Sequence, residues 1–237
     1  MRFDVSVIIN GTPALLHGML NTVLFCAGGT VLGLLVGSAV ALIRLSGPLP
    51  LRWLAIAYVE VVRDTPFLIQ AFLLFFGLAY FGIGLSASTA GLLVLTLYSG
   101  ANFSESIRAA IQSVAKGQMD AARALGLSYS VAMLKVIFPQ TWGFLLPSLT
   151  NQVIGLIKES AALSVITVPE LALAAQVIVG DTFSPVETYV AVTTLYWLVI
   201  TALAAAFRRV ERWQSGHGVA RTAASLGLRS TFASMWR

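Results

Sequence analysis

Long apolar stretches separated by short charged segments dominate the pattern of this chain. The first, residues 19–43, contains no charged side chain. As an α-helix it would be about 37 Å long, enough to cross the roughly 30 Å core of a bilayer. Within it Gly29, Gly33 and Gly37 recur every four residues, which allows another helix to approach closely. Further predominantly apolar stretches lie within residues 60–84, 88–112, 144–168 and 187–207. This pattern predicts an all-α transmembrane fold with about five spanning helices.

The composition agrees with a membrane protein. The chain is 57% hydrophobic and 11% charged, whereas about a quarter of the residues of a soluble domain are charged. Five spans with short loops leave no room in 237 residues for a sizeable soluble domain. A domain that converts chemical energy must therefore belong to another chain. Because no short apolar core with an A-x-A cleavage site begins the sequence, we expect no removable signal peptide.

The basic side chains orient the predicted bundle. Of the 15 lysines and arginines, all but Arg2 and Lys158 lie in or beside the segments that join spans one and two, join spans three and four, or follow span five. Five spans place these segments on one side of the membrane, and basic residues accumulate on the cytosolic side. Residues 169–187 contain acidic residues and no basic one. We therefore expect a periplasmic amino-terminal segment, residues 1–18, and a basic cytosolic tail, residues 208–237.

Residues 116–139 interrupt the apolar pattern with two short amphipathic helices on the cytosolic side. The first is predicted over Gln118–Leu125, and Gly126 suits the left-handed residue that ends it. Ser128 suits the N-cap of the second helix, and Pro139 is predicted to end it. Helices this short cannot bury their apolar faces alone. We expect them to occupy a groove on a partner protein.

The spacing within this loop resembles a known pattern. Asp120, Ala121 and Ala122 are followed after three residues by Gly126 and, nine residues later, by V-I-F-P ending at Pro139. The EAA loop of ABC importer membrane subunits has the pattern EAA-x3-G-x9-I-x-L-P. The departures are Asp120 in place of Glu, Val136 in place of Ile and Phe138 in place of Leu. The spacing is the same throughout.

The resemblance extends over about residues 17–212. The stretches VEVVRDTPFLIQAFLLFFGL and NFSESIRAAIQSVAKGQMDAARALGL resemble the permeases of the histidine, glutamine, arginine and opine group. NQVIGLIKESAAL is similar to the segment in which that group usually has K-D-[ST]-[ST]-L. Here Glu159 stands in place of the Asp, and Ala161 and Ala162 stand in place of hydroxyl or small residues.

The resemblance implies a type I ABC importer permease-like fold in a bacterial cell inner membrane. It implies a second permease subunit, identical or paralogous, a pair of ATP-binding cassette subunits that bind ATP and Mg, and a periplasmic solute-binding protein. The residues expected to couple the ATPase to the bundle are Asp120, Ala121, Ala122, Gly126 and Pro139. The chain itself is expected to be no enzyme, because it lacks the phosphate-binding G-x-x-x-x-G-K-[ST] motif. We expect no metal site, no catalytic residue and no nucleic-acid partner.

Charged side chains in or near the apolar stretches are candidates for a solute site, because a charge there costs at least about 2.5 kcal/mol and usually faces a cavity. If the fourth span begins near Pro147, Glu159 lies about 18 Å along it, near the midplane. Glu159 either contacts the solute or pairs with another span. Lys158 points about 100° away from Glu159, so the two do not neutralise each other along the helix. Lys158 either snorkels or braces a carboxylate.

Three further residues complete the candidate solute site. Glu105 either contacts the solute or pairs with Arg108 on the same helix. Asn102 lies one turn before Glu105, and Gln70 lies one turn beyond Pro66. Either amide can bind a solute or another helix. Glu105 and Glu159 offer countercharge, which favours an amino acid with a cationic side chain or an opine that carries one. The alternative is that the binding protein alone sets the specificity.

Two other functions are compatible with the apolar pattern. The first is an ATP-independent secondary amino-acid transporter or channel that uses the buried carboxylates as proton or ion sites. The chain has no second half that repeats the first, although a homodimer would supply the symmetry. The second is a membrane scaffold without a solute path, which leaves the charges within the spans unexplained.

Overall fold

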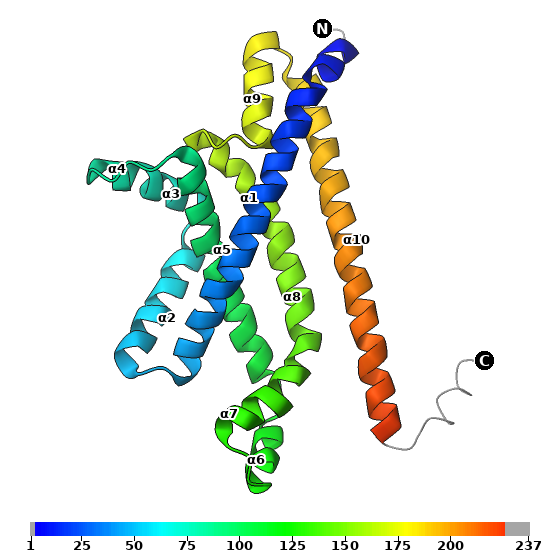
Figure 1. Ribbon diagram of the computed structural model, residues 1–237. Helices are drawn as coiled ribbons and strands as arrows, with labels where there is room; N and C mark the ends of the chain where they lie inside the picture. The colour runs from blue at the N-terminus through cyan, green and yellow to red at the C-terminus, as the bar shows by residue number, and fades with distance from the viewer. Residues whose placement is uncertain (1–2, 226–237) are drawn as a thin grey trace, which may run out of the picture.

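The computed structural model describes residues 3–225 and the side chains of residues 3–213, and this part of the chain is helical without a strand (Figure 1). The helices are α1 (Val5–Ser46), α2 (Leu49–Asp64), α3 (Phe67–Phe72), α4 (Leu78–Tyr80), α5 (Ala87–Gln112), α6 (Lys116–Ala124), α7 (Tyr129–Ala132), α8 (Phe138–Glu159), α9 (Leu171–Thr182) and α10 (Pro185–Ser225). Two π-helical segments, Leu73–Gly77 and Met133–Ile137, and a 3-10 segment, Ser160–Ile166, join some of them. The all-α fold is confirmed.

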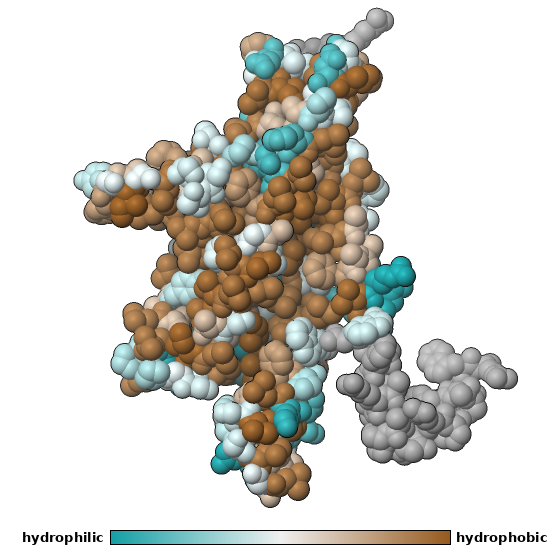
Figure 2. All heavy atoms as spheres, in the orientation of Figure 1, coloured by the Kyte–Doolittle hydropathy of each residue, from teal (hydrophilic) through white to brown (hydrophobic). Residues whose placement is uncertain are grey.

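Two helices of the described part are long and apolar enough to cross a membrane. They are α1 and the Pro185–Trp213 part of α10. The number rises to four if each of two bent helix pairs, α2 with α3–α4 and α7–α8 with α9, is one span. Hydrophobic side chains cover most of the face drawn in Figure 2, with hydrophilic ones mainly towards its ends. This surface suits a molecule surrounded by lipid.

α1 and α5 form the centre of the fold. Gly29, Gly33 and Gly37 of α1 are buried, and a Cβ added at any of them would collide with α5. The Ser99 hydroxyl of α5 donates to the Gly29 carbonyl oxygen at 2.9 Å. The close approach predicted for the glycine row is therefore confirmed, and the helix that uses it is α5.

α1 begins at Val5, so residues 5–18, which were predicted to precede the first span, are helical. The Asp4 carboxylate accepts a hydrogen bond from the Ser6 amide at 2.9 Å and caps this end of the helix. The Asp4 amide also donates to Glu187 Oε1 at 3.1 Å, which ties the start of α1 to α10. Neither contact is visible in the hydrophobic pattern that placed the first span.

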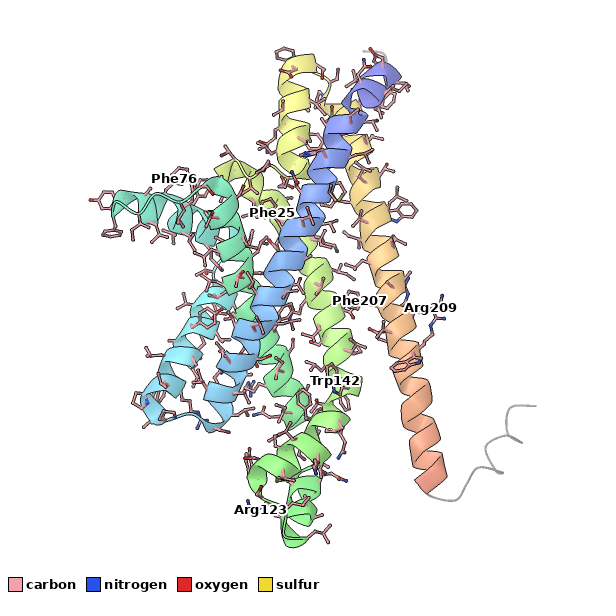
Figure 3. All side chains as sticks on the ribbon, in the orientation of Figure 1. Phe25, Phe76, Arg123, Trp142, Phe207 and Arg209 are labelled. Atoms are coloured by element: carbon pink, nitrogen blue, oxygen red, sulfur yellow. The ribbon has the colours of Figure 1, made fainter. Side chains whose placement is uncertain are left out.

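The predicted span over residues 60–84 is not one straight helix. α2 ends at Asp64, and α3–α4 continues at 114° to it. Pro66 has no amide hydrogen and disfavours the helical conformation at Thr65, which is extended here. The resulting arm, α3 to α4, projects from the bundle in Figure 1 and carries the exposed Phe76 labelled in Figure 3.

The predicted span over residues 144–168 also differs from the structure. α8 begins earlier, at Phe138, and ends at Glu159. The chain then tightens into the 3-10 segment and reverses at Thr167, which has the left-handed φ of 60°. α9 and the amino-terminal end of α1 lie at one end of the molecule, and α6 and α7 lie at the other (Figure 1). Part of the predicted tail, residues 226–237, lies outside the described residues.

Candidate functional site

The first candidate site is the loop of α6 and α7 at one end of the bundle. Gly126 follows α6 with a φ of 82°, which confirms the predicted left-handed residue. The Gly126 amide donates to the Arg123 carbonyl at 3.0 Å and the Leu127 amide to the Ala122 carbonyl at 3.2 Å. This pair of bonds is the Schellman arrangement, which satisfies the last carbonyls of a helix and fixes the direction of the following chain.

The second short helix begins as predicted but does not end as predicted. The Ser128 hydroxyl accepts a hydrogen bond from the Val131 amide at 3.4 Å, which confirms Ser128 as the N-cap of α7. Pro139 does not end this helix: α7 continues through the π-helical segment Met133–Ile137 into α8, and Pro139 lies in the first turn of α8. Pro139 has no amide hydrogen, and the wider π turn before it absorbs the loss of one helical bond. The helix α7, the π-helical segment and α8 are thus one continuous helical rod.

The loop buries two alanines and exposes two leucines. Ala122 and Ala132 are buried where α6 contacts α7 and the π turn. Leu125 is 83% exposed and Leu134 is 69% exposed, and Asp120 and Ala121 are exposed as well. Arg123 lies at the tip of the loop in Figure 3. The apolar side chains at this end have no cover in the described part of the chain, as expected of a surface that docks on a partner.

The second candidate site comprises the polar and charged residues within the bundle. Glu105 accepts a hydrogen bond from Arg44 Nη1 at 2.8 Å, and Arg63 Nη1 lies 4.0 Å from the same carboxylate oxygen. Arg108, on the next turn of α5, also pairs with Glu105. The Glu105 carboxylate therefore joins α1, α2 and α5. The arginines already supply the countercharge that a solute would have to offer.

The two amides predicted as solute ligands have partners within the chain. Gln70 Nε2 donates to the Val62 carbonyl at 2.7 Å and to the Thr65 carbonyl at 2.9 Å, at the bend between α2 and α3. Asn102 Nδ2 donates to the Tyr98 carbonyl at 2.9 Å, one turn earlier on α5. The Gln70 donors are used to satisfy carbonyls that the break at Pro66 leaves open. Within the described residues, no hydrogen bond engages the side-chain carbonyl oxygen of Asn102.

Glu159 and Lys158 end α8, and both side chains are exposed. Within the described residues, neither Lys158 nor Glu159 forms an ion pair, in contrast to Glu105. Glu159 interacts electrostatically with Tyr98, whose ring packs edge-on against Phe67 at 5.0 Å. Glu159 therefore lies within electrostatic range of Tyr98 on α5, whereas Glu105 is engaged by its arginine cluster.

A polar contact between α5 and α8 was missed by the sequence analysis. Ser148 Oγ donates to Ser106 Oγ at 2.8 Å, and Gln152 Nε2 lies 3.4 Å from the same oxygen. Ser148 and Gln152 are four residues apart, as are Asn102 and Ser106, so each pair shares one helix face. That spacing is the signal that could have placed the two polar faces opposite each other.

A buried carboxylate was also missed. Glu170, expected in a loop, is 1% exposed. It caps α9 by accepting from the Leu173 amide at 2.8 Å, and the Tyr196 and Thr22 hydroxyls lie 3.3 and 3.5 Å from its other oxygen. An acidic residue just before an apolar run is a signal for a helix start. No local sequence pattern predicts that Thr22 of α1 and Tyr196 of α10 contact this carboxylate.

Residues 29–216 match the family described as "Binding-protein-dependent transport system inner membrane component". The chain is 42% identical, over 78% of its length and 83% of the relative, to a probable glutamine ABC transporter permease protein of Bacillus subtilis. It is 34% identical, over 92% of its length and 95% of the relative, to a nopaline transport system permease protein of Agrobacterium fabrum.

The fold also matches solved structures. The crystal structure of an amino acid ABC transporter with histidines is similar with a TM-score of 0.85 and 35% identity, over 90% of this chain and 99% of that one. An inward-facing methionine ABC transporter shares the fold with a TM-score of 0.67 and 20% identity, over 90% of this chain and 99% of that one. The overall fold of the chain is thus one that solved ABC transporters share.

Proposed function

This chain belongs to the family of binding-protein-dependent transport system inner membrane components, and we propose that it is the permease subunit of an ATP-driven ABC importer for a polar amino acid or opine. The observation that carries the proposal is the loop of α6 and α7. Its EAA-like spacing includes a Schellman turn at Gly126. It exposes Leu125 at the end of α6 and Leu134 in the π-helical segment that continues into α8. The permease relatives of glutamine and nopaline systems support the solute class.

The loop would couple the bundle to a separate ATPase. Its exposed apolar side chains fit a cleft on an ATP-binding subunit, which binds ATP and Mg and supplies the energy. Because α7, the π turn and α8 are continuous, a displacement of the loop moves α8 as a rod. A second permease subunit and a periplasmic solute-binding protein complete the assembly, and the membrane of residence is the bacterial inner membrane.

Of the four residues predicted as solute ligands, Glu159 and Asn102 remain the best supported. Glu159 is exposed, has no ion-pair partner in the described residues and lies within electrostatic range of Tyr98, which is one turn before Asn102. A cationic group on the solute would supply its countercharge. We assign Glu105 and Gln70 to the architecture, because three arginines and two backbone carbonyls already engage them.

Affinity purification from the native host tests the proposal. A tagged form of this chain should bring down an ATP-binding subunit, and reconstituted vesicles should take up labelled amino acid only with the binding protein and ATP. Leu125→Glu should reduce recovery of the ATPase, whereas Leu198→Gln on the exposed side of α10 serves as a control outside the loop. Uptake driven by an ion gradient in vesicles without ATP would establish the secondary transporter instead.

A further inference from the structure

Lys158 is the charged group that the proposed function leaves unexplained. It lies beside Glu159 at the end of α8, exposed, and no carboxylate of the described residues pairs with it. A lysine and a glutamate inside an apolar span need either water or a partner. Since neighbouring residues on a helix point about 100° apart, they cannot be each other's partner within one chain.

The face of α8 that carries Lys158 is unsuited to lipid. Residues Phe144, Pro147, Asn151, Gly155 and Lys158 recur at intervals of three and four and so share one side of the helix. Phe144 is 61% exposed, and Asn151 is exposed too. A Cβ added at Gly155 would meet no atom within 4 Å. An amide and an ammonium along one face, with a glycine that permits close approach, indicate contact with another protein helix.

A second copy of this chain offers the matching charges. Two copies inserted in the same orientation are related by a two-fold axis along the membrane normal, so their α8 helices run parallel and equal residues lie at equal depth. Lys158 of one copy and Glu159 of the other differ in height by only about 1.5 Å. Two-fold symmetry forms the same contact twice: Lys158 of the first copy meets Glu159 of the second, and Lys158 of the second meets Glu159 of the first. A surface with a lysine beside a glutamate is therefore complementary to itself.

We propose that Lys158 of each copy pairs with Glu159 of a second copy, across an interface formed by the two α8 helices. The inference rests on the proposed function, in which two membrane subunits flank the solute path. The two symmetric pairs neutralise four charges and join the subunits at the depth of the Glu159 carboxylate. A cationic solute that reaches Glu159 must displace the partner subunit's Lys158.

Disulfide trapping between two differently tagged copies tests this pairing. One copy carries Lys158→Cys and the other Glu159→Cys, both on a Cys26→Ala background that removes the native thiol. Mild oxidation in membranes should give a cross-linked product that carries both tags. A pair with Leu198→Cys in both copies is the control, because Leu198 is exposed on α10, and it should give none. Absence of the product with both tags, or cross-linking to a different chain, overturns the proposal.

Charge exchange supplies a second test whose readout does not depend on solute binding. Lys158→Glu and Glu159→Lys each place like charges across the interface, and we expect each to lower the melting temperature of the purified complex by roughly 2–4 °C. The double variant restores the pair and should return the temperature to within about 1 °C of the original value. A double variant no more stable than either single variant overturns the proposal.

These outcomes are separate from the test of the proposed function. An ATP-binding subunit that co-purifies with the original chain, together with a failed cross-link, would remove only the pairing. A chain that takes up solute without any ATP-binding subunit would remove the proposed function, whatever the cross-link shows.

Discussion

Glu105 and Glu159 are both carboxylates in predicted membrane spans, yet the fold treats them in opposite ways. Glu105 is surrounded by Arg44, Arg63 and Arg108 from three helices. Glu159 ends α8 exposed, without an ion pair in the described residues. An acidic residue in an apolar stretch can therefore be neutralised within its own chain or be left there for a group from outside the chain. The helices that pack around it decide which.

Removal of the Glu105 carboxylate should have the largest effect. Glu105→Ala leaves three arginines close together without their counterion, and we expect a loss of about 2–3 kcal/mol in the free energy of unfolding. Thermal unfolding of the detergent-solubilised protein measures it. Glu60→Ala, an exposed acidic residue on α2, is the matched control. Equal stability of the two variants would mean that the arginine cluster is not structural.

Neutralisation of Glu159 should change function more than stability. Glu159→Gln keeps the shape of the side chain and removes its charge, so we expect about a tenfold loss of ATPase stimulation by cationic amino acids, equivalent to about 1.4 kcal/mol. Stimulated ATPase activity of the reconstituted complex across neutral and cationic amino acids measures the preference. An unchanged preference for cationic solutes would show that the binding protein alone sets specificity.

Gly126 differs from both carboxylates, because its role is set by the local backbone geometry. Gly126→Ala forces a side chain into the left-handed region, at a cost of about 1 kcal/mol, and should loosen the loop. We expect a lower ratio of solute transported to ATP hydrolysed, with the solute preference unchanged. Gly117→Ala in α6 is the control, because a Cβ there meets no atom within 4 Å and its φ is not left-handed. Equal coupling ratios in both variants would contradict the role assigned to Gly126.

The smallest expected effect is at Gln70. Gln70→Leu removes the donors that satisfy the Val62 and Thr65 carbonyls at the bend, so we expect a loss of about 1 kcal/mol in unfolding free energy. The ratio of cationic to neutral amino-acid uptake should not change. A shift in that ratio, at unchanged stability, would return Gln70 to the solute site.

The features that the sequence predicts correctly depend on nearby residues. The left-handed Gly126 and the Ser128 cap follow from a few consecutive side chains, and the glycine row of α1 follows from its own spacing. The three-helix cluster at Glu105 depends on Arg44 and Arg63, which are distant in the chain. No local pattern contains that information.

The incorrect prediction at Pro139 has a different cause. A proline usually ends a helix because one hydrogen bond is lost and the ring clashes with the preceding turn. Here the π-helical segment Met133–Ile137 widens the backbone just before Pro139 and lets the helix continue. The bend at Pro66 shows the more common outcome. The two prolines differ in whether the preceding turn can widen, which the residue type alone does not reveal.

The π turn before Pro139 also determines the direction in which the side chains of α8 point around the helix axis. A π turn holds one residue more than an α turn, and one residue corresponds to about 100° of rotation and 1.5 Å of rise. Rewinding that single turn to α-helical geometry would swivel the whole of α8 about its long axis. The swivel equals the angle between neighbouring side chains, so a one-residue adjustment at the base of the rod would turn one of Lys158 and Glu159 into the direction that the other now faces.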